Sequence, residues 1–241
     1  MIINKHLQPY NLEYCSENDL DNGNMTLIID RLLEEVGSDD IFIDAGAYIG
    51  AMSVPVVAQK KPYLTVAIEP NTKAFPILDR NLNKFSGTAR FHTWNAPVCE
   101  NDGMVLFQQA DNTGSLTRKY DKKFFPKDER IGMTIDRVLA MDNPEHRKVV
   151  IKMDIEMSEP RAWKGMKNSF DDIKCVIMEF FFQGWREQNM DALEFYDEIV
   201  SDGFSFYTLH REPFDRERFK QYAEGFNDDF ILSRKRDFQR P

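Results

Sequence analysis

The stretch IFIDAGAYIG, residues 41–50, decides the fold of this chain. Three apolar residues, Ile41 to Ile43, lead into Asp44, and Gly46 and Gly50 then lie in a turn of small residues before apolar residues resume. This order is typical of a buried parallel strand that ends in a tight loop and continues as a helix. Glycine allows the backbone of such a loop to approach a ligand closely, because it has no Cβ atom.

A second acid follows at the distance that a nucleotide site requires. The apolar run Leu64 to Ile68 ends in Glu69, which Pro70 and Asn71 follow. Strand, glycine turn, helix, strand and acid form the order of a nucleotide-binding βαβ unit, in which the second acid receives ribose hydroxyls. The alternative is a glycine turn in an α/β protein without a ligand, and the position of Glu69 weighs against it.

Composition limits the possible classes of protein. The 241 residues, 42% of them hydrophobic, suffice for one sizeable α/β domain. No apolar run reaches the roughly 20 residues of a membrane span, and the first residues lack the pattern of a signal peptide. Three widely spaced cysteines indicate neither a disulfide framework nor a zinc knuckle, so we expect a cytoplasmic protein. The net charge of −9 argues mildly against a nucleic-acid substrate.

Strands and helices are predicted to alternate along most of the chain. We expect residues 1–24 to be a lead-in segment and residues 25–241 to be a single domain. Its predicted helices include 25–36, 51–59 and 191–200. The predicted strands are 41–43, 64–68, 89–94, 105–109, 149–153, 175–180, 204–209 and 230–232, with residues 109–117 a loop and 119–130 a charged, exposed segment. The alternation predicts an α/β fold with a mostly parallel sheet and helices on both faces.

Polar residues follow the carboxyl ends of these predicted strands. They are Asp44, Glu69, Asn95, Asp154 and Glu179. Ligands of open parallel sheets bind beyond these ends. The clustering is the strongest indication from the residues themselves that the chain has a binding site.

Three acids, Asp154, Glu156 and Glu159, lie close together after the predicted strand Val149 to Met153. Helix capping needs one acid, and three within six residues is more than capping requires. Such carboxylates could orient a substrate hydroxyl, accept its proton or hold a divalent cation. The plainer alternative is an acid-rich helix start that the helix dipole favours.

Together these motifs resemble the FkbM-type methyltransferases, which use S-adenosylmethionine (SAM) and have the Rossmann-like class I methyltransferase fold. The resemblance covers roughly residues 41–182. The matching pieces are DAGAYIG, the run Glu69-Pro70-Asn71, the pair Asn81-Leu82, the turn Asn95-Ala96, the stretch Gly114-Ser115-Leu116, the run Thr134-Ile135-Asp136, the signature Ile151, Lys152, Asp154, Glu156 and Glu159, and the strand end Met178-Glu179. In this chain Tyr48 replaces a glycine of the first motif, Met157 replaces the signature glycine, and 180–182 is unusually aromatic.

The resemblance implies a SAM-dependent O-methyltransferase with a seven-stranded sheet and a sugar, glycan or glycosylated natural product as its acceptor. It implies a cofactor site formed by Asp44, Gly46, Ala47, Tyr48, Gly50, Glu69, Asn71, Asn95, Ala96, Ser115 and Asp154. Asp154, Glu156 and Glu159 are the candidate catalytic residues, and we assign no metal ligands, although a divalent metal is an open alternative. Trp163, Trp185 and Phe181 could stack on a sugar or belong to the core.

Two other functions are compatible with the same fold. One is a methyltransferase that acts on RNA or protein, although the segment Asp154-Ile155-Glu156-Met157 differs from the motif that amino-group methylation usually carries. The other is a non-catalytic module that retains the fold, against which the three acids argue. The sequence leaves open the acceptor hydroxyl, the oligomeric state and any larger polypeptide to which the chain belongs. We expect no membrane partner.

Overall fold

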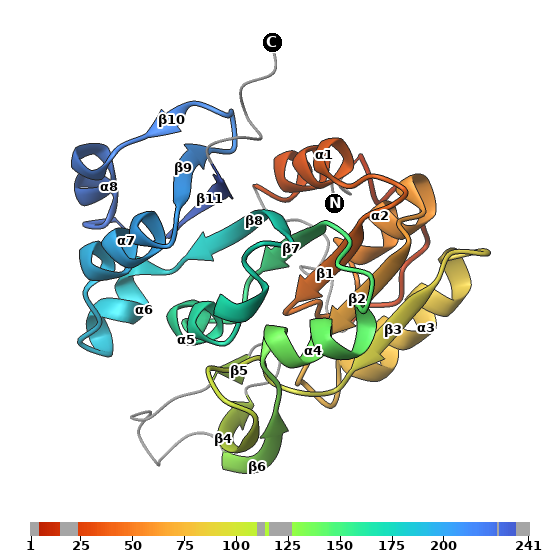
Figure 1. Ribbon diagram of the computed structural model, residues 1–241. Coiled ribbons are helices and arrows are strands. Elements are labelled where there is room, and N and C mark those ends of the chain that lie inside the picture. The colour runs from red at the N-terminus through yellow and green to blue at the C-terminus, as the bar shows by residue number, and fades with distance from the viewer. Residues whose placement is uncertain (1–4, 15–23, 110–113, 116–126, 226, 235–241) are drawn as a thin grey trace.

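The computed structural model describes residues 5–14, 24–109, 114–115, 127–225 and 227–234. Their centre is an eight-stranded sheet with the order β10-β9-β11-β8-β7-β1-β2-β3 (Figure 1). Its strands are β1 (Ile41–Ala45), β2 (Leu64–Ile68), β3 (Phe91–Trp94), β7 (Val149–Met153), β8 (Ile173–Phe180), β9 (Phe204–Thr208), β10 (Pro213–Phe214) and β11 (Asp228–Arg234). Neighbouring strands from β3 to β8 are parallel, whereas β11 runs antiparallel to β8 and β9. The predicted Rossmann-like α/β fold is confirmed.

The prediction of seven strands was wrong by one. The additional strand is β10, which pairs antiparallel with β9 at the edge of the sheet through only two residues. A run of two residues has no detectable alternation, so no sequence pattern could indicate it. Two short helices were also missed: α6 (Phe182–Glu187), which continues the aromatic run after β8, and the mostly charged α8 (Arg216–Tyr222).

Helices cover both faces of the sheet because its central strands are apolar on both sides. β1, β2 and β7 are buried at every position, as expected of parallel strands between two layers of helices. Side chains of α1 (Met25–Glu35) and α2 (Ser53–Lys60) pack with Phe42, and α3 (Phe75–Phe85) packs with α2 and Ala67. Side chains of α4 (Ile135–Asp142), α5 (Glu159–Lys164) and α7 (Ala192–Ser201) pack with Ile43. The two layers leave the strand ends as the accessible edge.

Aromatic side chains fill the half of the core around β8, β9 and β11. Phe180 has its ring centroid 5.1 Å from that of Trp185 and 5.3 Å from that of Phe230. Trp163 and Trp185 are both fully buried, so these two belong to the core and do not form a sugar-stacking surface. The aromatic exit from β8 is therefore the anchor that fixes α6 beside the sheet.

A separate three-stranded antiparallel sheet with the order β5-β4-β6 lies between β3 and α4 in the chain (Figure 1). It consists of β4 (Gly103–Gln109), β5 (Gly114–Ser115) and β6 (Lys127–Gly132). The predicted loop 109–117 contains β5, and the predicted charged segment 119–130 ends in β6. The other residues of these two segments, apart from Gln109, lie outside the described part of the chain.

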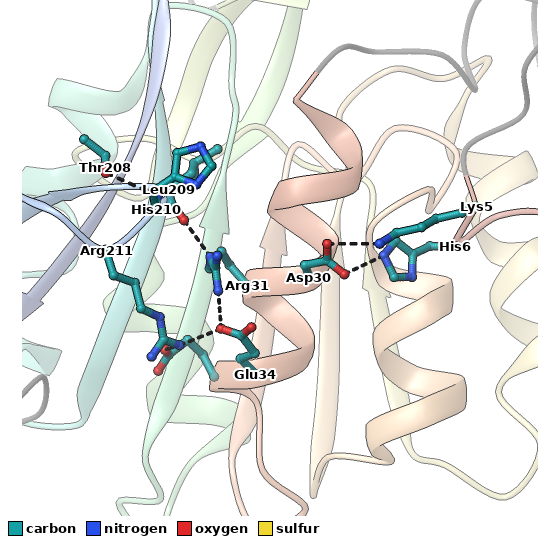
Figure 2. Close-up of polar contacts among 10 residues, drawn as sticks. Lys5, His6, Asp30, Arg31, Glu34, Thr208, Leu209, His210 and Arg211 are labelled. Carbon is teal, nitrogen blue, oxygen red and sulfur yellow. Dashed lines mark hydrogen bonds and ion pairs between the residues drawn. The ribbon is translucent and has the colours of Figure 1, made fainter. Parts of the chain in front are cut away.

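Ion pairs hold helix α1 on two sides, as Figure 2 shows. Asp30 accepts hydrogen bonds from Lys5 Nζ at 3.3 Å and pairs with His6 Nε2 at 2.8 Å. On the other side Arg31 donates to the carbonyl of Leu209 at 2.6 Å, and Arg211 pairs with Glu34 at 2.8 Å. The first pair attaches residues 5–14 to the helix, and the second ties the helix to the segment after β9.

Candidate active site

The turn between β1 and α2 is built around a buried carboxylate. Asp44 is 1% exposed, and its Oδ2 accepts a hydrogen bond from Ser53 Oγ at 2.5 Å. Its Oδ1 is buried and has no hydrogen-bond partner among the described residues. Burial raises the pKa of Asp44 to about 6, against the opposing charge of Lys152. An unsatisfied buried acceptor is costly and indicates an absent donor or cation.

Gly46 brings this turn against the end of β7. A Cβ atom at this position would lie 1.7 Å from the carbonyl oxygen of Asp154, so only glycine fits. Tyr48, which stands where the family motif has a glycine, adopts the left-handed conformation with φ of 49°. The turn thus has at Tyr48 a backbone shape that glycine adopts more easily, at the cost of the strain that a side chain brings there.

Glu69 connects the ends of β1 and β2. Its two carboxylate oxygens accept hydrogen bonds from the backbone N–H of Tyr48 at 2.8 Å and of Asn71 at 2.6 Å. Glu69 is 6% exposed, and burial raises its pKa to about 7 although these hydrogen bonds oppose the rise. Asn95 at the end of β3 donates to the Glu69 carbonyl at 2.8 Å, and Ala96 beside it is 6% exposed.

A buried lysine lies among the acids at the end of β7. Lys152 is 2% exposed, and its Nζ donates to Asp154 Oδ2 at 2.8 Å. Burial works to lower the pKa of Lys152, but the carboxylates of Asp154 and Asp229 outweigh it and raise this pKa. Burial likewise works to raise the pKa of Asp154, but the ammonium of Lys152 holds that pKa below its ordinary value. The neighbouring ammonium group therefore favours the charged form of Asp154.

Glu179 completes this group from β8. It shares a hydrogen bond with Asp154 and accepts another from Asn227 Nδ2 at 2.8 Å. Burial and the negative charge of Asp154 raise the pKa of Glu179. Because two adjacent carboxyl groups hold one proton more easily than none, the raised pKa favours Glu179 over Asp154 as the group that holds it.

The other two predicted catalytic acids are placed differently from each other. Glu159 is fully buried; its Oε1 accepts a hydrogen bond from Ile155 N at 3.0 Å, and its Oε2 has no partner among the described residues. Burial raises its pKa to about 8. Glu156 is partly exposed, and burial together with the charge of Asp154 raises its pKa to about 7.

The structure thus collects most of the predicted site residues at one edge of the sheet. Asp44, Glu69, Asn95 and Asp154 follow or end β1, β2, β3 and β7, which are adjacent. Ser115 belongs instead to the separate sheet, where it pairs with Gln108, and its side chain is not described.

Sequence reasoning placed Glu179 among the strand-end polar residues and Lys152 in the signature run, but it named neither as a site residue, and it gave no role to Ser53. A lysine inside the otherwise apolar run Val149–Met153 was the available signal for Lys152. No group of three or more metal-binding side chains was found among the described residues. In the same part of the chain, no helix is both long and apolar enough to cross a membrane.

Comparisons with known proteins support the class of this fold. No known family profile matches the chain. A hexuronic acid methyltransferase, AglP of Haloferax volcanii, is 26% identical over 156 residues, which are 63% of this chain and 60% of that protein. This chain therefore matches less than two thirds of the length of that relative.

Solved structures are similar at low sequence identity. The precorrin-6y C5,15-methyltransferase of Geobacter metallireducens GS-15 has a TM-score of 0.50 and 11% identity, with 92% of this chain and 93% of that chain covered. TYW2 of M. jannaschii, solved in complex with AdoMet, has a TM-score of 0.42 and 14% identity, with 88% and 75% covered. The first likeness supports the fold, and the curated relative is named for a methyltransferase.

Proposed function

We propose that the chain is a SAM-dependent O-methyltransferase that transfers a methyl group to a hydroxyl of a sugar or glycan. The observation that carries the proposal is the meeting of two acid groups at one sheet edge. Asp44 and Glu69 surround the glycine turn, and Gly46 of that turn lies against the backbone of Asp154. A nucleoside-binding turn and a set of titratable acids are thus brought together.

The residues of the turn fit SAM in charge and in shape. The unpartnered Oδ1 of Asp44 suits a cationic group, and the acids around it give the edge a negative potential that a sulfonium cation would neutralise. Glu69 already accepts two backbone hydrogen bonds, and each carboxylate oxygen retains capacity for a ribose hydroxyl. Gly46 leaves the backbone uncovered where a side chain would otherwise project.

The three acids after β7 have different roles in the proposed reaction. When bound, SAM supplies an activated methyl group, so the protein needs mainly to align the acceptor and to remove its proton. Asp154, held charged by Lys152, is suited to orient a hydroxyl. Glu156, with a pKa of about 7, is suited to accept the proton, because a general base is most effective when its pKa lies near the working pH. Glu159 is fully buried and accepts a hydrogen bond from Ile155 N, and it thereby supports the backbone between Asp154 and Glu156.

The sugar acceptor is favoured by one comparison and one property of the site. The relative from Haloferax volcanii is named for a hexuronic acid. The carboxylates of Asp154 and Asp229 outnumber the one buried lysine on which both act, and this net negative charge is unfavourable for a phosphate backbone. The hydroxyl of a neutral sugar has no such charge to overcome, whereas the carboxylate of a hexuronic acid would meet the same repulsion.

The test measures the cofactor and the acceptor separately. Calorimetry should show SAM binding, and Glu69→Ala should weaken it about 10- to 100-fold through the loss of charged hydrogen bonds. Glu194→Ala, an exposed acid on α7, is the matched control and should bind normally. Labelled methyl transfer is then measured to free hexuronic acids, neutral monosaccharides, glycan pools and total tRNA. Transfer to tRNA alone would replace the sugar assignment, and SAM binding without any transfer would favour a non-catalytic module.

A further inference from the structure

The turn that follows β7 has an unusual backbone. Glu156 and Met157 are consecutive non-glycine residues with φ of 54° and 74°. A left-handed conformation is unfavourable for a residue with a Cβ atom, and two in succession require the surroundings to impose it. The strain falls next to Asp154, within the edge that the proposed function uses.

Helix α6 provides the contact that holds this turn. Met157 is 7% exposed, and its side chain lies against Gly184 in α6. A Cβ atom at Gly184 would lie 2.2 Å from Met157 Sδ and 2.7 Å from its Cγ. Gln188, just after the helix, donates from Nε2 to Met157 Sδ at 3.4 Å. The glycine thus leaves a notch in α6 that the methionine fills.

The helix itself cannot move easily. Phe182 and Trp185 of α6 are 1% and 0% exposed and belong to the aromatic core around β8. The ring centroids of Phe182 and Trp185 lie 6.0 Å and 5.1 Å from that of Phe180. Because a close-packed core of this kind is hardly compressible, it fixes the position of α6 relative to β8.

We propose that Met157 is a positioning residue, which by filling the notch at Gly184 holds the Glu156 carboxyl in its partly buried place near Asp154. The proposal rests on the proposed function only for the role of Glu156 as a base; the contact and its effect on the Glu156 carboxyl are properties of the free protein. The charged groups that act on Glu156 are Asp154 and Lys152, and Glu156 in turn acts on Glu159.

Three variants separate the side-chain contact from the backbone requirement. Met157→Gly keeps, and even favours, the left-handed conformation but removes the side chain. Gly184→Ala closes the notch and should displace Met157. The double variant Met157→Gly/Gly184→Ala restores the space, because the added methyl group then meets no sulfur. Gly37→Ala, distant from the site in a segment before β1, is the control.

The readout is a carboxyl NMR titration of Glu156 in the free protein, which needs no acceptor. In the wild type we expect a midpoint near neutrality. Met157→Gly and Gly184→Ala should each shift it down toward the ordinary glutamate value of about 4.3, because the carboxyl becomes more exposed. The double variant should titrate like Met157→Gly alone, since both changes act on the same contact.

The outcomes distinguish the alternatives. A midpoint unchanged in both Met157→Gly and Gly184→Ala would overturn the proposal, and a shift in Gly37→Ala of the same size would reduce it to general loosening. If Gly184→Ala fails to fold, Met157→Gly alone decides. Where methyl transfer is measurable, the pH of half-maximal kcat should follow the titration while the KM for SAM stays constant. Absence of transfer with the titration shifted would reject the proposed function and leave this contact standing.

Discussion

Carboxylates of the candidate site and carboxylates on helix α1 differ in burial and in their hydrogen-bond partners. Asp44 at the end of β1 and Glu159 at the start of α5 each have a buried oxygen with no partner among the described residues, and burial raises the pKa of both. On α1, Asp30 and Glu34 each contact basic side chains (Figure 2). The hydrogen bonds of Lys5 and His6 outweigh burial and lower the pKa of Asp30.

The difference separates acids whose charge is paired within the fold from acids that are candidates to serve a ligand. Paired acids on a surface contribute little to stability and demand no explanation. A buried carboxylate oxygen without a partner destabilises the folded state, and a protein retains such a group where binding or chemistry compensates. The following four experiments challenge or sharpen this comparison.

The largest effect is expected at Glu156. Glu156→Gln keeps the size of the side chain but removes the base, which typically lowers the rate about 10²- to 10⁴-fold. The affinity for SAM should change little. The matched change on α1, Glu34→Gln, should leave the rate unchanged. Near-normal turnover of Glu156→Gln under single-turnover conditions would show that alignment alone drives the reaction.

Removal of the buried lysine should destabilise the protein strongly. Lys152→Met leaves Asp154 and Asp229 without their counter-charge. Breaking a buried ion pair costs about 3–5 kcal/mol, and we expect the lower value because the Asp154 side chain is 35% exposed. Urea unfolding measures the change. A loss below about 1 kcal/mol would mean that solvent already compensates these acids.

The buried acids should make stability depend on pH with a defined sign. Because the folded pKa of Glu159 is raised to about 8, the folded state binds more protons than the unfolded state between about pH 4.5 and 8. Stability therefore falls as pH rises through this window, by up to about 1.4 kcal/mol per pH unit for this group. Between pH 5.5 and 7.5, Glu159→Gln should reduce the loss of unfolding free energy by about 2–3 kcal/mol in total. An unchanged slope in denaturant titrations would contradict the raised pKa.

The smallest effect is expected on α1. Asp30→Asn removes the charge that pairs with Lys5 and His6. The Asp30 side chain is 34% exposed. Solvent screening limits such pairs to about 0–1 kcal/mol, and 1 M salt should erase the difference from wild type. A thermal unfolding loss comparable to that of Lys152→Met would remove the distinction between the two groups of acids.

Local patterns in the sequence were enough for the framework of the fold. The strands 64–68 and 149–153 were predicted with the bounds that the structure shows, and the helix 25–36 differs from α1 by one residue. These segments are strongly periodic or continuously apolar, so short-range information determines them. The positions of Asp44, Glu69 and Asp154 at adjacent strand ends followed from the same patterns and from the rule that parallel strands end at one edge.

The short elements β10 and α6 were not predicted from the sequence because they depend on residues that are distant in the chain. β10 exists through its pairing with Tyr207 and Phe206 of β9, and α6 through burial of its aromatic residues in the core. Neither property is encoded in the two to six residues of the element. From the sequence, Trp163 and Trp185 could stack on a sugar, although a place in the core was favoured, and their packing against Phe195 shows that they belong to the core.

The sequence by itself determined the alternation of strands and helices, the glycine turn and the set of acids that follow the strands. Only the tertiary structure decided which acids have a buried oxygen without a partner among the described residues. It also decided that Lys152 contacts Asp154 and that Met157 fits the notch at Gly184. The physical reason is that burial and charge interaction act between residues that are close in space and distant in the chain. Residue type determines what an acid can do, whereas the folded surroundings set its protonation.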